Sequence, residues 1–377
     1  MRVDPALFAA GDPVLRMLAG AGHRAFVVGG PVRNALLGVA VSDVDIATDA
    51  RPERVMALAE AAGLRAVPTG IEHGTVTVVT DGAGVEVTTF RRDVETDGRR
   101  AVVAFSDRIE EDAARRDFTM NALYADAGGQ VFDPLGGLPD LLARRVRFIG
   151  AATDRLREDY LRALRFFRFH AWYGDPEGGI DPDGLAACAA HAEGVEGLSR
   201  ERVGREMLKL LAAPDPAPAV AAMAASGILS RVLPGAVPDL LPVLVHLEAG
   251  RAAPDGLRRL AVLGGTEVAE RLRLSKAETR TLDDLRRDLT PGEAGYRLGA
   301  ARGRDHVLLR AAALGEADPD PALAQAARGS AAVFPLKAAD LAGLEGPALG
   351  AALKAAEARW IASGFTLDKA ALLHPRD

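Results

Sequence analysis

The stretch VSDVDIAT, residues 41–48, sets two aspartates one residue apart among β-branched apolar residues. Such alternation is typical of a buried strand, in which successive side chains point to opposite faces. Asp43 and Asp45 then share one face, while Val44 and Ile46 pack on the other. Two carboxylates this close repel each other unless a cation neutralises them. The stretch therefore indicates a divalent cation site, with a solvated pair at the edge of a loop as the alternative.

A glycine turn and a further acid flank this pair. Upstream, GGPVRNALLG (residues 29–38) places Gly29 and Gly30 before a helix whose free N–H groups and dipole suit a phosphate, with Arg33 as a further cation. Downstream, Glu86 lies in the alternating stretch GVEVTTF, either as a third carboxylate or at an exposed hairpin position. The alternative for the glycines is a plain tight turn. Together these features predict a site for Mg²⁺ and a nucleoside triphosphate, because carboxylates without histidine or cysteine fit Mg²⁺ better than zinc.

The chain changes character near residue 150. Before that point, short strands and helices alternate, as expected for a small mixed α/β domain. After it, strand patterns almost vanish, and the abundant Ala, Leu and Arg favour helices. The sequence therefore predicts an α+β protein. Strands are expected at 24–28, at 41–49 and twice within 74–90, and helices at 13–21, 31–38, 51–63 and 156–174.

Composition and charge limit the partners. The 377 residues carry a formal net charge of -6, which argues against indiscriminate coating of nucleic acid. Between Arg144 and His170, however, eight arginines face only three acids, so a polyanion is expected to dock there. Cys188 is the single cysteine, and Asp4 and Asp12 interrupt any apolar signal segment. Without an apolar run of about 20 residues, we expect a cytoplasmic protein that does not span a membrane.

Four ordered motifs carry a family resemblance. GGPVRNALLG, SDVDIAT, RRDFTMNAL (residues 115–123) and REDYLRALRFFRF (residues 157–169) resemble, in order and spacing, the motifs of class II tRNA nucleotidyltransferases, the CCA-adding enzymes, and of related bacterial poly(A) polymerases. The resemblance implies a polymerase-β-like nucleotidyltransferase head with a small mixed sheet over residues 1–150. It further implies an all-helical neck over 151–215, with the nucleobase-recognition helix, and a tRNA-binding body and tail over 216–377.

The resemblance also assigns roles to residues. Asn34 departs from the family, which more often has aspartate there, so a carboxylate that orients Arg33 is missing. Glu86 matches a family strand acid and is kept as a candidate third catalytic carboxylate. The implied roles are metal binding and catalysis for Asp43 and Asp45, triphosphate binding for Gly29, Gly30 and Arg33, and ribose and phosphate contacts for Arg116 and Asn121.

A second group of residues predicts base selection. On one helix, Asp159 and Arg162 are neighbours at i and i+3, and Arg165 and Arg168 continue the row toward the triphosphate or the base stack. A carboxylate beside a guanidinium presents an acceptor next to a donor, which matches the Watson–Crick edges of cytosine and adenine but mispairs with uracil and guanine. The resemblance assigns this role to Asp159 and Arg162, with Glu158 placed to orient the arginine. The alternative is a salt-bridged, solvated helix face.

The predicted activity is template-independent addition of C, C and A to the tRNA 3' end from CTP and ATP, with Mg²⁺ and release of pyrophosphate. The long charged segment over residues 90–112 coincides with a flexible family loop linked to the switch from C to A, and its full length favours complete CCA addition. The alternatives are a poly(A) polymerase, an enzyme that adds only CC or only A, and a non-catalytic RNA-binding protein.

Overall fold

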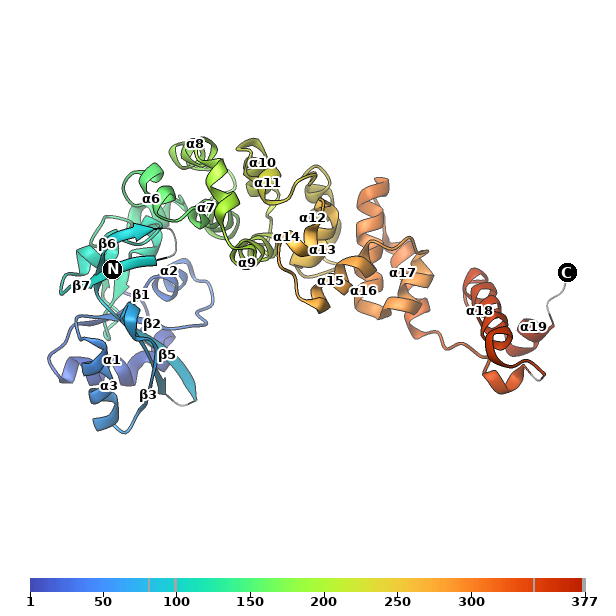
Figure 1. Ribbon diagram of the computed structural model, residues 1–377, viewed down its shortest axis with the longest axis horizontal. Coiled ribbons are helices and arrows are strands. Elements are labelled where there is room, and N and C mark those ends of the chain that lie inside the picture. The colour runs from blue at the N-terminus through green and yellow to red at the C-terminus, as the bar shows by residue number, and fades with distance from the viewer. Residues whose placement is uncertain (81, 98–99, 342, 375–377) are drawn as a thin grey trace. The chain divides into compact units, whose positions relative to one another are not determined.

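Two compact units make up the protein. The computed structural model describes residues 1–80, 82–97, 100–341 and 343–374 (Figure 1). The first unit comprises Met1–Ser199 and Pro218–Val232, and the second comprises Arg200–Ala217 and Leu233–Asp377. Every residue predicted for metal, triphosphate or base recognition lies in the first unit.

The first unit is built around a seven-stranded mixed sheet, counted over its described residues, in the order β3-β4-β5-β2-β1-β8-β9. Strands β2 and β5 run parallel, and the other neighbouring pairs are antiparallel. A separate hairpin is formed by β6 and β7. The strands are β1 Ala25–Val28, β2 Asp45–Thr48, β3 Arg65–Gly70, β4 Thr75–Thr80, β5 Ala83–Thr89, β6 Arg91–Asp97, β7 Arg100–Phe105, β8 Tyr124–Ala125 and β9 Val131–Phe132.

Helices α1 (Asp12–Gly20) and α3 (Pro52–Ala61) lie side by side and pack on the sheet, as Figure 1 shows. Helix α2 (Gly30–Leu37) follows β1 directly and contacts the segment around residues 119–121. The sheet and these helices exclude water from the apolar side chains that alternate along the strands, which is the main source of stability for such a layer. The predicted helices and strands of residues 13–63 are therefore present, within a few residues at their ends.

The strand predicted over residues 41–49 is shorter than expected. It begins at Asp45, so Asp43 lies in the irregular segment before β2. The physical reason is the turn at Gly29: the neighbouring strand β1 ends there, and residues before Asp45 lose their partner. The predicted alternation nevertheless holds, because Val44 and Ile46 are buried while Asp43 and Asp45 are exposed.

The predicted continuous helix over 156–174 is wrong, because it is interrupted. Asp159 has an extended backbone (φ -157°, ψ 105°) and separates α6 (Ala152–Glu158) from α7 (Leu161–Tyr173). Helix α7 is anchored to the motif at 115–123 by a cluster of aromatic rings with centroids 5.0–6.3 Å apart, made up of Phe118, Phe148, Phe166 and Phe169. The remaining α-helices of this part are α4 Ile109–Ala114, α5 Leu138–Leu142, α8 Pro182–Ala190, α10 Ala217–Ala225 and α11 Ile228–Val232.

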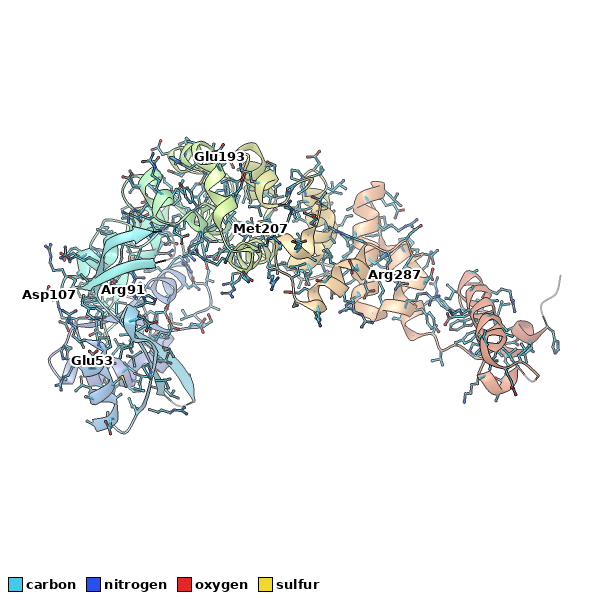
Figure 2. All side chains as sticks on the ribbon, in the orientation of Figure 1. Glu53, Arg91, Asp107, Glu193, Met207 and Arg287 are labelled. Carbon is cyan, nitrogen blue, oxygen red and sulfur yellow. The ribbon has the colours of Figure 1, made fainter. Side chains whose placement is uncertain are left out.

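The segment predicted to be a flexible loop, residues 90–112, folds as the β6–β7 hairpin followed by α4. Arg91, labelled in Figure 2, begins the hairpin and donates a hydrogen bond to the carbonyl of His73. Residues 98 and 99 of this segment lie outside the described residues.

The second unit is a series of helices, as the sequence predicted. Among its described residues, apolar side chains of α12 (Leu241–Glu248), α15 (Lys276–Leu285) and α16 (Pro291–Leu314) pack together. Further along the chain, Trp360 packs on Tyr296, Phe334 and Phe365. In the described part of the chain, no helix is both long and apolar enough to cross a bilayer. The helices are α9 Arg200–Leu211, α12 Leu241–Glu248, α13 Gly256–Leu263, α14 Val268–Arg271, α15 Lys276–Leu285, α16 Pro291–Leu314 with a break at Gly299, α17 Asp320–Ala331, α18 Gly346–Ala362 and α19 Lys369–Leu373.

Candidate active site

Three carboxylates gather where β2 and β5 run side by side. Asp45 pairs in register with Glu86 across the parallel strands, and Asp43 precedes the same strand by two residues. Desolvation by the surrounding protein raises the pKa of the Asp45 carboxyl, repulsion from Glu86 and Asp43 adds to the rise, and Arg116 opposes it. The negative charge at this edge is therefore only partly neutralised by the protein itself.

The donor set fits a hard divalent cation. It consists of carboxylate oxygens, which Mg²⁺ prefers, and a bound cation would relieve the repulsion that raises the pKa of Asp45. Over residues 1–80, 82–97, 100–341 and 343–374, no three His, Cys, Asp or Glu side chains are grouped as a ready metal site. Asp43, Asp45 and Glu86 are thus close to one another but do not form a complete set of metal ligands in this structure. The role of Glu86 as a metal ligand stays a prediction.

A glycine turn faces the motif at 115–123. Gly29 has φ 73° and ψ -120°, a conformation that L side chains rarely adopt, and its amide donates to the carbonyl of Leu123 at 3.0 Å. A Cβ at Gly29 would lie 3.3 Å from Nη1 of Arg116 and 3.5 Å from the carbonyl oxygen of Asn121. Gly30 begins α2, whose N–H groups are available to an anion. The turn predicted for phosphate binding therefore lies against Arg116.

The structure buries Arg33 instead of exposing it toward a ligand. Asn34 Oδ1 accepts from Nε and Nη2 of Arg33 at 3.2 and 2.9 Å, while Asn34 Nδ2 donates to the carbonyl of Ala40. Nη1 of Arg33 donates to Asn121 Oδ1, and Nη2 donates to Tyr173 Oη at 2.9 Å. Burial lowers the pKa of this guanidinium. The amide of Asn34 thus orients the Arg33 guanidinium without adding a charge.

These contacts continue as a chain of four polar residues, Arg33, Asn121, Asp117 and Arg165, which we call the polar chain. Asn121 Nδ2 donates to Asp117 Oδ1 at 2.8 Å, and Asp117 Oδ2 accepts from both Nε (2.7 Å) and Nη2 of Arg165. Burial would raise the pKa of Asp117, but Arg165 and the hydrogen bonds hold it below its usual range. The polar chain connects α2, the motif at 115–123 and α7.

Arg116 is oriented by a second buried acid. Its Nη2 donates to Asp112 Oδ2 at 2.9 Å, its Nε donates to Tyr124 Oη at 3.3 Å, and Tyr124 Oη donates to the same Asp112 oxygen at 2.8 Å. Burial opposes ionisation of Asp112, yet Arg116 and Arg115 keep its pKa below the usual range. This arrangement directs the remaining guanidinium nitrogen of Arg116 toward the Gly29 turn.

The predicted base-selecting pair lies at the break between α6 and α7. Arg162 donates to the Glu158 carboxylate, as predicted, and to the carbonyls of Arg155 and Arg115, each at 3.2 Å. The amide of Arg162 also donates to the carbonyl of Asp159 at 2.9 Å. The two residues are therefore neighbours, although Asp159 is not part of the helix, and its carboxylate accepts from the amide that begins α7.

Three arginines surround one aromatic ring on α7. The guanidinium carbons of Arg33, Arg165 and Arg168 lie 5.1, 5.3 and 4.5 Å from the centroid of Phe169. Cation–π attraction holds such side chains in place without neutralising their charge. The predicted residues Arg165 and Arg168 therefore lie close to Arg33 and to the polar chain, not along an isolated solvated face.

Sequence reasoning missed four residues that hold these predicted residues in position: Asp112, Asp117, Tyr124 and Tyr173. Asp117 lies in the motif RRDFTMNAL, directly after two arginines and four residues before Asn121. This position could have indicated that Asp117 binds a basic or amide side chain of the site. The two tyrosines and Asp112 carried no comparable pattern, because their partners are fixed only by the folded chain.

Two family models match parts of the chain. Residues 25–147 match the family model "Poly A polymerase head domain", and residues 179–240 match "Probable RNA and SrmB- binding site of polymerase A". The chain is 42% identical over 190 residues to CCA tRNA nucleotidyltransferase 1, mitochondrial, of Homo sapiens, covering 50% of this chain and 44% of that protein. It is also 42% identical over 248 residues to the CCA-adding enzyme of Streptococcus pyogenes, covering 65% and 58% of the two chains.

A solved structure extends the similarity over nearly the whole chain. The Bacillus stearothermophilus CCA-adding enzyme in complex with CTP has a TM-score of 0.76 and 31% identity, covering 95% of this chain and 93% of that one. The chain belongs to the CCA-adding enzyme family. In sequence it spans about half the length of the curated CCA-adding enzymes that it matches, 44% and 58% in the two cases above. Membership of the CCA-adding enzyme family confirms the predicted polymerase-β-like head followed by helices. Nucleotidyltransferases of this kind generally use a divalent metal ion.

Proposed function

We propose that the protein is a template-independent nucleotidyltransferase that adds C, C and A to the 3' end of tRNA from CTP and ATP. The observation that carries the proposal is the carboxylate edge of Asp43, Asp45 and Glu86 beside Arg116 and the Gly29 turn. It is supported by the 31% identical relative, a CCA-adding enzyme in complex with CTP. The 3'-hydroxyl of the RNA attacks the α-phosphorus of the incoming nucleotide, and pyrophosphate leaves.

Asp43 and Asp45 would hold Mg²⁺, with Glu86 as the third carboxylate. The bound ion would supply charge neutralisation at the phosphoryl centre and a lowered pKa of the attacking hydroxyl. The amides after Gly29 and the free nitrogen of Arg116 would contact the phosphates, because both lie at the turn.

For Arg33 and Asn121, the hydrogen bonds favour a positioning role over the direct nucleotide contacts predicted from the sequence. Their polar groups are already engaged with Asn34, Tyr173 and Asp117, so we infer that they fix the turn and α7 relative to each other. Precise placement of the nucleotide is itself a large part of catalysis by phosphoryl-transfer enzymes.

Base selection is proposed for Asp159 and Arg162, with Arg165 and Arg168 at the triphosphate or the base stack. Glu158 and two carbonyls hold the guanidinium of Arg162 in one orientation. A uracil or guanine edge would leave two polar groups mispaired at about 1–3 kcal/mol each, which corresponds to discrimination of about 30-fold or more. Cytosine and adenine present the matching edge, and this would limit addition to C and A.

The remaining regions are proposed to serve RNA binding. The proposed domains are a head over residues 1–150, a neck over 151–215, and a body and tail over 216–377. Arginines of the helical domains would contact the sugar–phosphate backbone of tRNA. The cytoplasmic location predicted from the sequence remains a prediction, as does the magnesium ion itself.

The test is extension of a tRNA that ends at its discriminator base, with Mg²⁺ and the four nucleoside triphosphates singly and combined. Two cytidines, one adenosine and then no further addition are expected. A run of adenosines would instead establish a poly(A) polymerase on the same head, and no extension by the parent protein would favour an RNA-binding protein without catalysis.

Matched variants locate the chemistry. Asp45→Asn should abolish addition while tRNA binding stays within a few-fold of the parent. Glu53→Gln removes an acid of the same unit, exposed on α3, and should leave addition unchanged. Normal addition by Asp45→Asn would refute the assignment of the carboxylate edge.

A further inference from the structure

An aromatic ring at the break between α6 and α7 lies against a glycine further along the chain. Tyr160 follows the extended residue Asp159 and directly precedes α7. A Cβ at Gly194 would lie 2.1 Å from Cδ1 and from Cε1 of Tyr160, and 2.4 Å from its Cγ. Carbon atoms that are not bonded to each other pack best about 3.5–4.0 Å apart. The ring therefore occupies the space that a side chain at residue 194 would need.

The requirement for glycine at residue 194 comes from this contact and not from the backbone. The φ angle of Gly194 lies outside the left-handed region that favours glycine, so an alanine there would not strain the main chain. Gly197 provides a comparison in the same short 3-10 helix, Ala192–Gly197. Its φ angle is also outside that region, and a Cβ there would meet no heavy atom of the described residues within 4 Å. Of these two glycines, only Gly194 adjoins a ring that an added methyl group would displace.

The 3-10 helix that receives the ring is held in place by its own contacts. The side chains of Ala192 and Val195 are buried. Arg231, on α11, pairs with Glu193, which is labelled in Figure 2, with Nη2 of the arginine 3.5 Å from Oε1 of the glutamate. Burial of the apolar side chains supplies most of this anchoring, because exposed ion pairs contribute little. The tyrosine is only half-buried, so a methyl group at residue 194 would displace the ring more readily than the 3-10 helix.

The carboxylate of Asp159 is tied to the position of Tyr160. Asp159 is a single extended residue between two helices (φ -157°, ψ 105°), and its amide donates to the Arg155 carbonyl only at 3.4 Å. Its Oδ1 accepts from the amide of Leu161 at 3.1 Å, and its carbonyl accepts from the amide of Arg162 at 2.9 Å. Because both of these shorter bonds lead to the first turn of α7, the carboxylate moves with the residue that precedes that turn.

The guanidinium of Arg162 has separate supports. It donates to the Glu158 carboxylate of α6 and to two backbone carbonyls. A displacement of Tyr160 would therefore shift the carboxylate of Asp159 without an equal shift of the guanidinium. The acceptor and the donor of the proposed base-selecting pair would then lose their spacing.

We propose that the contact between Tyr160 and Gly194 sets base specificity, with Tyr160 as a positioning residue for Asp159. This role rests on the proposed base selection by Asp159 and Arg162, and it adds the residues that fix the spacing of their polar groups. With that spacing changed, cytosine and adenine lose part of their advantage, because the matching hydrogen bonds become longer or bent. Uracil and guanine lose nothing, since they do not make these bonds. Selectivity should therefore fall.

The measurement is the ratio of kcat/KM for CTP to that for UTP in nucleotide addition to tRNA by the full chain. Gly194→Ala should lower this ratio at least about tenfold, since a displacement of about 1 Å can change rates by about 100-fold. Gly197→Ala introduces the same methyl group in the same 3-10 helix and should leave the ratio at the parent value. A loss of folded protein lowers both rates equally, so the ratio separates selectivity from stability.

Variants of Tyr160 test whether the ring transmits the effect. Tyr160→Ala should lower the ratio, and Gly194→Ala should then have no further effect, because the ring that it displaces is absent. Tyr160→Phe keeps the ring and should keep the parent ratio. Tyr160→Ala also carries the test if Gly194→Ala does not fold.

Arg162→Ala, assayed in parallel, separates failure of this proposal from failure of the proposed function. If Arg162→Ala lowers the ratio while Gly194→Ala and Tyr160→Ala keep it, the contact plays no part in selection and the proposal is overturned. An equal fall in Gly194→Ala and Gly197→Ala would also overturn it, because the effect would not come from the ring. If Arg162→Ala keeps the ratio as well, base selection by Asp159 and Arg162 is itself refuted. Equilibrium affinities for CTP and UTP give the same comparison without nucleotide addition.

Discussion

Replacing Asp117 by asparagine should disconnect α7 from the rest of the polar chain. The amide oxygen can keep the Oδ1 bonds from Asn121 Nδ2 and the amide of Phe118. At Oδ2, however, an NH₂ group would face Nε and Nη2 of Arg165, so two charge-assisted acceptor contacts become a contact between donors. The change alters charge and hydrogen bonding with almost no change in volume.

The partial exposure of Arg165 limits how much the substitution lowers the free energy of unfolding. Asp117 is buried, whereas 32% of the Arg165 side chain is exposed and can turn to water when its partner is lost. The loss should therefore fall below the 3–5 kcal/mol of a fully buried broken pair and amount to about 2–3 kcal/mol. The pKa of Asp117 is lowered on folding, so its ionised carboxylate adds to the free energy of unfolding. This contribution is fully present above the pKa of the unfolded chain, about 3.9, and is lost as the pH falls through the pKa of the folded protein. The parent and the variant should converge in acid.

The assay is urea unfolding of the full chain at neutral pH, beside nucleotide addition under saturating tRNA. Asp154→Asn is the matched control, because its carboxylate is 66% exposed and 3.9 Å from Arg157, and it should change stability by less than about 0.5 kcal/mol. Asp117→Asn should also lower kcat/KM for CTP while a double-mutant cycle with Arg165→Met shows coupling above about 1 kcal/mol. Equal stability of the two asparagine variants, or no coupling with Arg165, would refute the reasoning.

Three further predictions concern other sites. Glu248 is buried between Arg258 and Arg259, with oxygens 2.7 Å from each, so Glu248→Gln should destabilise the second unit by about 3 kcal/mol or more in urea unfolding, whereas an effect below 1 kcal/mol would show that the arginines find other partners. Glu86 contributes to the raised pKa of Asp45, and this raised pKa lets protons compete with a cation for Asp45 up to higher pH. Glu86→Gln should therefore move the acid limb of the pH–rate profile to lower pH. An unchanged acid limb would show that Glu86 does not influence the pKa of Asp45. Arg162→Ala should relax base choice so that UTP and GTP are incorporated, and intact rejection of both would exclude Arg162 from base selection.

Local patterns predicted much of the site because the relevant residues are close in sequence. The alternation of residues 43–46 places Asp43 and Asp45 opposite Val44 and Ile46, and this holds in the structure even where the strand does not. The start of β2 was not predictable in the same way, because it depends on where its neighbour β1 turns away at Gly29.

Contacts between distant residues account for what the sequence could not predict. Arg33 looks like an exposed cation on a short helix, but its partners Asn121 and Tyr173 lie 88 and 140 residues further along the chain. The break at Asp159 was also hidden, because buried Leu156, Leu161 and Leu164 on either side keep a pattern that one amphipathic helix would show. A hydrophobic period alone does not reveal one extended residue.

Three successive residues of the motif at 115–123 serve different parts of the site. The carbonyl of Arg115 binds Arg162, the side chain of Arg116 meets the Gly29 turn, and Asp117 holds Arg165. An insertion or deletion of one residue in this segment would therefore displace Arg162, Arg116 and the anchor of α7 at the same time. Natural variation in chain length among relatives is accordingly expected to be eliminated between Asp112 and Tyr124.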